Sequence, residues 1–148
     1  MVDPLQEVFP NLVAYQITSP PSEKYNCIAW AAGDATLWWW PDEGPGIYWP
    51  PGIAKEETIP MFTSLFAGLG YSPCSSADTE DGFERIALFA NASDFPTHAA
   101  RELPSGRWTS KLGRVEDIEH ALHDLEGDEY GKVVLVMLRP RSAAKANG

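Results

Sequence analysis

The sequence predicts an α+β protein in which N-terminal helices pack on an antiparallel sheet. Apolar residues recur at helical spacing just after Cys27 and again from Phe62 to Leu69. Strand-like runs follow in the C-terminal half, and two of them flank a Pro-Ser-Gly turn that is typical of a hairpin. Helices that precede neighbouring antiparallel strands favour α+β over a doubly wound α/β fold.

In the N-terminal half, the many prolines of residues 1–25 predict an irregular lead-in. Asn26 is a suitable N-cap for a first helix whose apolar positions continue to Trp38. Residues 38–54 contain four Trp, one Tyr, four Pro and three Gly, so we expect an aromatic loop there. A second helix follows, capped by Thr58 and ended by Gly70.

In the C-terminal half, a polar loop is expected at residues 71–82, with Cys74 as a surface thiol. Apolar alternation and turn residues then predict strands over residues 83–90, 97–103 and 107–112, a third helix around residues 115–125, and a central strand over residues 130–138. On that helix Glu116, His120, His123 and Asp124 form a polar side, for which a solvated face is favoured over a metal site.

Size and charge limit the possible partners. The 148 residues suit one domain, which we assign to residues 1–140, followed by a flexible tail at residues 141–148. A net charge of −10 argues against DNA or RNA as a partner. There is no apolar run of membrane-spanning length and no basic secretion signal. Two cysteines are no disulfide framework, so we expect a cytoplasmic protein with free thiols.

The strongest candidate for chemistry is a pair formed by Cys27 and His98. A thiol in the first turn of a helix meets unpaired N–H groups, which lower its pKa and favour the reactive thiolate. His98, near the start of a predicted strand, would take and return the proton. The alternative also stays open, because a lone Cys on an apolar helix is often an inert core residue.

The predicted hairpin supplies a third member of this site. If Leu103 faces Arg107 across the turn, Ser110 lies diagonally from His98 on the same face, where it could fix the ring tautomer. Trp108 would lie on that face and shield the pair. Arg107 and Lys111 are expected to be solvated edge charges.

Two segments resemble a known superfamily. Residues 25–31 (Tyr-Asn-Cys-Ile-Ala-Trp-Ala) resemble the nucleophile helix of papain-like proteins, most closely the NlpC/P60 type, and residues 97–100 (Thr-His-Ala-Ala) resemble its His strand. The family's third polar position falls near Ser110. The chain also looks like a small bacterial branch with Asn-Cys-Ile-Ala-Trp-Ala and Trp-Thr-Ser-Lys-Leu-Gly and no established activity. The resemblance covers roughly residues 20–115 and implies a papain-like core.

These observations together predict a thiol hydrolase, either a cysteine peptidase or amidase, or an acyltransferase, that acts on an amide bond of a peptide or similar substrate. Cys27 would attack and His98 would shuttle the proton, with Ser110 or a backbone carbonyl orienting the ring and with no metal or cofactor. The alternative is a catalytically inactive binding module that uses the Trp-rich loop at residues 38–54 for a peptide, a sugar or a cationic ligand. Candidate substrate-binding residues are Asn26, Trp38, Trp49 and Trp108. The oligomeric state stays open.

Overall fold

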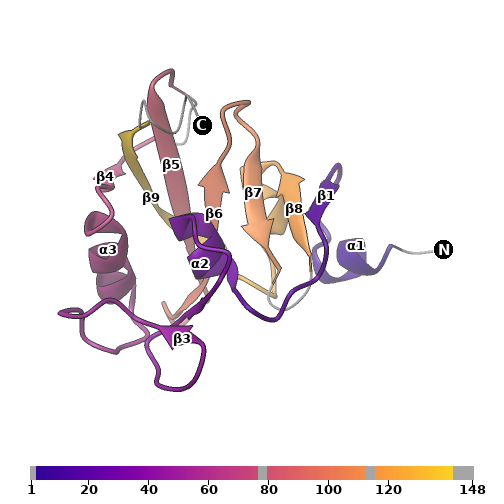
Figure 1. Ribbon diagram of the computed structural model, residues 1–148. Helices are drawn as coiled ribbons and strands as arrows, with labels where there is room; N and C mark the ends of the chain where they lie inside the picture. The colour runs from indigo at the N-terminus through magenta and orange to yellow at the C-terminus, as the bar shows by residue number, and fades with distance from the viewer. Residues whose placement is uncertain (1–2, 77–79, 113–115, 142–148) are drawn as a thin grey trace.

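The protein is an α+β fold built on one antiparallel sheet, as the computed structural model shows for residues 3–76, 80–112 and 116–141. The seven strands lie in the order β1-β8-β7-β6-β5-β9-β4, with short helices beside them (Figure 1). The strands are β1 (Gln16–Ser19), β4 (Ser72–Cys74), β5 (Phe83–Ala90), β6 (Pro96–Glu102), β7 (Trp108–Lys111), β8 (Asp117–His120) and β9 (Lys132–Pro140). The short strands β2 (Trp38–Trp39) and β3 (Ile47–Tyr48) form a separate parallel pair.

The two main helices begin at the capping residues that the sequence predicts. In α2 (Cys27–Ala32), Asn26 accepts a hydrogen bond from the Ala29 N–H at 3.1 Å. In α3 (Ile59–Ala67), Thr58 accepts one from the Met61 N–H at 3.3 Å. However, α2 does not reach Trp38, because Gly33 adopts a φ of +92° and ends the helix.

The N-terminal segment is more regular than predicted. Helix α1 (Pro4–Val8) begins after Asp3, whose side chain accepts from the Leu5 N–H, and a proline is compatible with a first helical turn. Strand β1 then pairs with β8 and forms one edge of the sheet. Three of its four residues are exposed, so it lacks the burial alternation that would reveal a strand in a sequence.

The third predicted helix is wrong. Residues 117–120 form β8, which pairs with β7, and a single 3-10 turn, η1 (Leu122–Leu125), follows it. Ile118, Leu122 and Leu125 are buried, and their spacing suits both this arrangement and a helix. Pairing with a distant strand decides between the two, and local spacing does not contain that information. Val115 lies outside the described residues.

The predicted polar loop at residues 71–82 contains a short strand. Residues 72–74 form β4, which pairs with β9 and places Cys74 opposite Val136. This makes β4 an edge strand and gives β9 a neighbour on each side, as expected for its apolar sequence. The tail at residues 142–148 lies outside the part of the chain that the structure describes.

Alternation along the strands divides the core into two clusters. The first core cluster lies under α2 and α3 and includes the strand residues Ile86, Leu88, Ala99 and Met137. The second core cluster lies on the other face and includes Ala87, Phe89, Ala100, Trp108 and Ile118, covered by residues near α1 and η1. The two faces of one sheet therefore place side chains in two separate environments.

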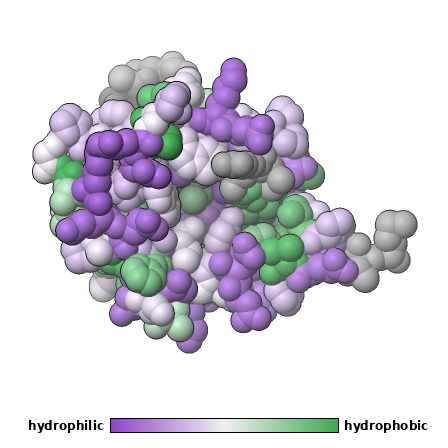
Figure 2. Space-filling model, turned by 90° about the horizontal axis from the view of Figure 1, so that it is seen from below, coloured by the Kyte–Doolittle hydropathy of each residue, from purple (hydrophilic) through white to green (hydrophobic). Residues whose placement is uncertain are grey.

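One face of the molecule shows how hydrophobic side chains are distributed there. Seen from below, green hydrophobic residues form separate patches among purple and pale ones (Figure 2). Within the described ranges, no helix is both long enough and apolar enough to cross a bilayer.

The turn before β9 depends on a glycine. Gly131 has a φ of +78°, and a Cβ there would lie 1.9 Å from the Ala90 carbonyl oxygen. Gly131→Ala therefore combines a left-handed backbone, which costs about 1–2 kcal/mol, with overpacking of about 1–3 kcal/mol. Gly82→Ala is the matched control, because its φ is +84° and nothing lies within 4 Å. Urea unfolding should show the larger loss for Gly131→Ala, and equal losses would contradict the contact.

Candidate functional site

Cys27 is the first residue of α2 and lies against β6. The thiol is buried, with 7% of the residue exposed. The backbone N–H groups of Ala99, Ile28 and Cys27 surround Sγ and favour its negative form, and the charge of Lys111 is close enough to act on it. The small side chain of Ala99 allows α2 to approach the strand this closely.

The expected lowering of the thiol pKa is wrong. Burial raises the pKa of Cys27 to about 11, because removal from water disfavours the thiolate. The three N–H groups and Lys111 act in the opposite direction, but their effect is smaller. In this structure Cys27 is therefore a neutral thiol at physiological pH.

His98 is fixed by the hairpin that the sequence predicts. The Leu103 N–H donates to the Arg107 carbonyl at 2.7 Å, and Arg101 pairs with Thr109, which confirms the expected register. Consequently His98 Nε2 lies 2.9 Å from Ser110 Oγ, as predicted. The imidazole is completely buried.

Two aromatic rings enclose His98. Tyr130 stacks on the imidazole with a centroid distance of 4.1 Å and an interplanar angle of 9°. Phe89, its partner on β5, contacts it edge-on at 5.1 Å. These contacts leave the imidazole little freedom to rotate.

Ser110 also connects His98 to a second histidine that the sequence interpretation placed on a solvated face. Ser110 Oγ lies 2.7 Å from His120 Nε2, and His120 Nδ1 lies 2.7 Å from the Ala121 carbonyl oxygen. His120 is fully buried. We call the chain from His98 through Ser110 to His120 the His–Ser–His relay.

The relay determines where the protons are. A carbonyl oxygen can only accept, so His120 carries its proton on Nδ1 and its Nε2 accepts from the Ser110 hydroxyl. Ser110 Oγ then accepts from Nε2–H of His98, which leaves Nδ1 of His98 as a bare lone pair. That Nδ1 is buried and has no hydrogen-bond partner.

This proton assignment requires neutral rings, and burial keeps them neutral. Burial lowers the pKa of His98 well below its ordinary value, and repulsion by His120 adds to the effect. The pKa of His120 is also lowered, mainly by burial. No carboxylate contributes to the His98 shift.

Cys27 and His98 approach neighbouring points of β6 from opposite faces of the sheet. Cys27 belongs with Ala99 to the first core cluster, whereas the His98 ring contacts Phe89 of the second. The N–H of Ala99, which follows His98, nevertheless acts on the thiol. Burial raises the pKa of Tyr130, and a negative charge on Cys27 would add to this effect. Neither ring nitrogen of His98 forms a hydrogen bond with the thiol.

Lys111 is a further site residue, which the sequence interpretation assigned to a solvated edge. Its side chain is completely buried, with Nζ donating to the Ser22 carbonyl at 2.7 Å and lying 5.0 Å from the Tyr25 ring centre. Tyr25 in turn donates to Asp117 at 2.9 Å. Strand alternation is the signal that could have revealed this burial. Lys111 and Thr109 lie on the same face of β7, and α2 covers that face.

The other proposed binding residues are mostly engaged within the fold. Asn26 Oδ1 accepts from Ala29 and Trp39, and its Nδ2 donates to the Trp39 carbonyl. Trp49 is buried and its indole N–H donates to the carbonyls of residues 53 and 54. Asn26 and Trp49 are therefore structural, whereas half-buried Trp38 lines a shallow groove.

Trp108 is placed as the hairpin register predicts. It pairs with His120 across β7 and β8 and is buried in the second core cluster. Its ring therefore belongs to the surroundings of the relay and excludes water from them.

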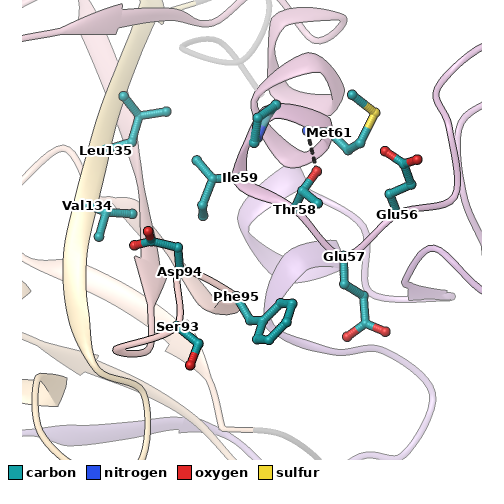
Figure 3. Close-up of a pocket in the computed structure, with 11 residues that line it drawn as sticks. Glu56, Glu57, Thr58, Ile59, Met61, Ser93, Asp94, Phe95, Val134 and Leu135 are labelled. Atoms are coloured by element: carbon teal, nitrogen blue, oxygen red, sulfur yellow. Dashed lines mark hydrogen bonds between the residues drawn. The ribbon is translucent and has the colours of Figure 1, made fainter.

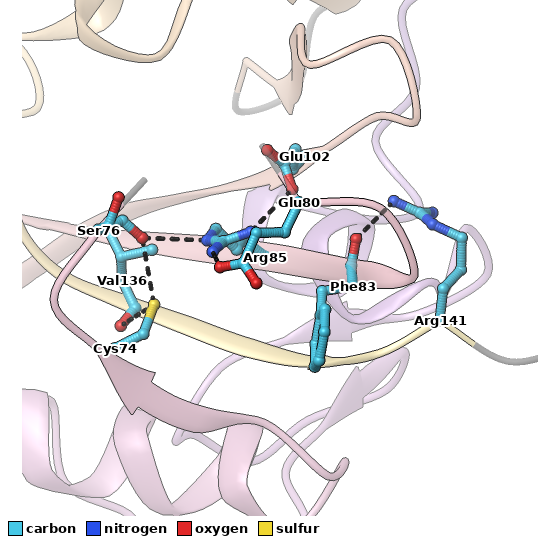
Figure 4. Close-up of polar contacts among 8 residues, drawn as sticks. All are labelled: Cys74, Ser76, Glu80, Phe83, Arg85, Glu102, Val136 and Arg141. Carbon is cyan, nitrogen blue, oxygen red and sulfur yellow. Dashed lines mark hydrogen bonds and ion pairs between the residues drawn. The ribbon is translucent and has the colours of Figure 1, made fainter. Parts of the chain in front are cut away.

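Cys74 lies far from this site in the sheet and has a different environment. Its thiol donates to the carbonyls of Ser76 and Val136 beside the buried guanidinium of Arg85 (Figure 4). It is a free thiol, and it is partly buried rather than fully at the surface as expected. Any test of Cys27 must therefore include a variant that lacks Cys74.

A metal site does not form from the polar residues of the predicted third helix. His123 is mostly exposed and lies 3.2 Å from Glu126, while His120 is turned into the core. Over the described ranges, no group of three His, Cys, Asp or Glu side chains could hold a metal ion.

The neutral relay predicts a pH-dependent stability. The unfolded chain binds protons at its histidines as the pH falls below about 6.5, whereas the lowered pKa values of His98 and His120 prevent this in the folded state. The free energy of unfolding should therefore fall from pH 7 to 5, by up to about 1.4 kcal/mol per pH unit for each histidine. Denaturant titrations should show a smaller fall for His120→Gln than for the wild-type protein, and an equal fall would contradict the neutral relay.

Comparison with known proteins gives a family but no activity. A family model with the description "Domain of unknown function (DUF7689)" matches residues 16–138, which include Cys27 and all three members of the relay. No curated protein and no solved structure matches the chain. Since the match extends over most of the sequence, the chain belongs to the family of the domain of unknown function DUF7689.

Proposed function

We propose that the protein is a thiol hydrolase or acyltransferase in which Cys27 attacks an amide carbonyl and His98 is the base. One observation carries the proposal. The relay leaves His98 Nδ1 as a buried lone pair without a partner, on the residue that precedes Ala99, whose N–H acts on the thiol. Buried polar atoms in native proteins are normally paired, and exceptions are often functional.

The proposed reaction begins with a proton transfer. As Cys27 Sγ bonds to the carbonyl carbon, its proton moves to His98 Nδ1, and the carbonyl oxygen becomes an oxyanion. His98 Nδ1–H then gives the proton to the leaving amine, and a thioester remains on Cys27. A water molecule or a second amine attacks the thioester, with His98 again taking and returning the proton.

Ser110 and His120 act through His98 as positioning residues. They hold its tautomer so that Nδ1 is free to accept, and they provide no negative charge to stabilise an imidazolium. Lys111 and the N–H groups around Sγ favour negative charge on the sulfur side. The pair is therefore neutral at rest, and charge separation has to accompany attack on the substrate.

The proposal requires a rearrangement on substrate binding that brings the two groups together, because Cys27 and His98 lie on opposite faces of the sheet and no hydrogen bond joins them. Catalytic hydrogen bonds often tighten only in the substrate complex. The pairs between β6 and β7 are Arg101 with Thr109 and Glu102 with Trp108, so this pairing lies beyond residues 98–100 of β6. A helix that presents Cys on an antiparallel sheet with a His strand supports our assignment to a papain-like, NlpC/P60-like core.

Acylation by p-nitrophenyl acetate tests the proposed chemistry without knowledge of the substrate. The wild-type protein should release nitrophenolate in a burst, and mass spectrometry should find one acetyl group on Cys27. His98→Asn should lower the acylation rate about 100-fold, since general-base catalysis is typically worth that much or more. Ser110→Ala should lower it less, and Cys27→Ala should abolish the burst.

The control is Cys74→Ser, which removes the other thiol and should leave the burst unchanged. Circular dichroism of each variant checks that it is folded. Acetylation at Cys74 alone, or an equal rate in folded His98→Asn, would exclude the proposed pair. Such a result would favour the binding module that uses the loop at residues 38–54.

Alkylation of Cys27 by iodoacetamide, measured in the Cys74→Ser protein, reports the resting state of the thiol. Because burial raises the pKa of Cys27 to about 11, the rate should be slow at pH 7 and should still increase with pH above 9. A rate that is already at its plateau below pH 8 would show a preformed thiolate–imidazolium pair and would contradict the neutral pair.

A further inference from the structure

A groove of about 680 Å³ lies between the N-terminal end of α3 and the turn that connects β5 to β6. Its apolar surface includes Ile59 of α3, Phe95 of the turn and Val134 of β9 (Figure 3). Phe95 and Val134 are 55% and 47% exposed and line the same groove, so they form a joint apolar surface rather than single exposed side chains. None of the residues of the His–Ser–His relay lines this groove.

The rim of the groove is acidic. Glu56 and Glu57 lie on the α3 side, and Asp94 lies beside Val134 on the other side (Figure 3). No Lys or Arg is among the described residues that line it. These three carboxylates also form no ion pair within the described part of the chain, although other carboxylates such as Glu43 do.

The start of α3 does not reverse this charge. A helix N-terminus carries a partial positive charge that favours anions. However, the Thr58 hydroxyl already accepts from one of the free N–H groups, and Glu56 and Glu57 precede the helix directly. Two full negative charges exceed the partial charge of the helix end, so the groove attracts cations.

We propose that this groove binds a peptide segment that carries lysine or arginine next to a hydrophobic residue. The alkyl part of a lysine or arginine covers apolar surface while its charged end stays in water near carboxylates. The groove provides both features, with Ile59 and Val134 as the apolar floor and Asp94 and Glu57 at the rim. The open face of Phe95 can also receive a guanidinium.

The groove adjoins the proposed catalytic pair along the chain. Phe95 lies three residues before His98, and Leu135 of the groove pairs with Leu88, which packs in the core cluster of Cys27. A bound peptide would therefore be the substrate or the acyl acceptor, and that role rests on the proposed function. The binding itself does not depend on Cys27.

Binding is measured by fluorescence anisotropy with the Cys27→Ala variant, which cannot turn a peptide over. The probes are three fluorescein-labelled peptides of equal length, Lys-Leu-Lys-Phe-Lys, Gln-Leu-Gln-Phe-Gln and Glu-Leu-Glu-Phe-Glu. The lysine peptide should bind at least tenfold more tightly than the other two, and its affinity should fall as salt is added.

Two changes test whether the groove is the site. The combined Glu56→Gln, Glu57→Gln and Asp94→Asn variant should lose about tenfold in affinity for the lysine peptide. Asn tolerates the left-handed backbone of residue 94, which has a φ of 64°. Phe95→Ala should lower the affinity for the lysine peptide and for the glutamine peptide by the same factor, because it removes apolar contact rather than charge.

The matched control is Glu7→Gln, which removes an exposed carboxylate on α1, at the opposite edge of the molecule from α3 (Figure 1). It should leave the affinity unchanged. Equal loss in this control would indicate unspecific attraction to a protein of net charge −10 and would overturn the proposed site. If the lysine peptide binds in the groove but Cys27 gives no acetyl burst, the groove stands and the thiol chemistry is rejected. If the burst occurs but the peptide does not bind, the thiol chemistry stands and the groove is rejected.

Discussion

The register between β6 and β7 determines which polar groups meet in this protein. The turn that joins Leu103 to Arg107 sets this register. It places Ser110 against His98 on one face and directs Lys111 toward α2 and Cys27 on the other. A slip by one residue would exchange these faces and bury a lysine beside the imidazole.

Burial then determines the charge states of the side chains that this register brings together. On one face the relay satisfies three of the four ring nitrogens of His98 and His120 without any carboxylate. A carboxylate next to His98 would favour the protonated imidazole and would occupy a ring nitrogen. The Ser110 hydroxyl carries no charge and contacts Nε2, so it leaves Nδ1 unoccupied. On the other face, Asp117 and Tyr25 accompany the cation of Lys111, whose pKa burial lowers.

The parts of the fold that short-range chemistry determines could be predicted from the sequence. Asn26 and Thr58 cap their helices because a side-chain oxygen can satisfy an N–H group three residues later. The hairpin and the contact of Ser110 with His98 follow from a three-residue turn.

Other features depend on contacts between distant segments, and the sequence could not provide them. The helical spacing of Ile118, Leu122 and Leu125 is equally compatible with a strand followed by a 3-10 turn, and only the partner β7 favours the latter. This error hid His120, because a residue on a solvated helix face cannot belong to a buried relay. The expected lowering of the thiol pKa is wrong for a separate reason, since a helix N-terminus is visible in a sequence and the burial of Cys27 is not.

The distribution of charge links the site to the groove. The chain has a net charge of −10, yet no carboxylate contributes to the pKa shift of His98, and the charge that acts on Cys27 is that of Lys111. The carboxylates Glu56, Glu57 and Asp94 lie instead at an exposed apolar groove, where water limits the cost of like charges. A cation attracted to that rim would approach β6 without entering the apolar surroundings of His98. Recognition of a charged segment and chemistry at a neutral pair can therefore occupy neighbouring regions of one sheet without altering each other's protonation.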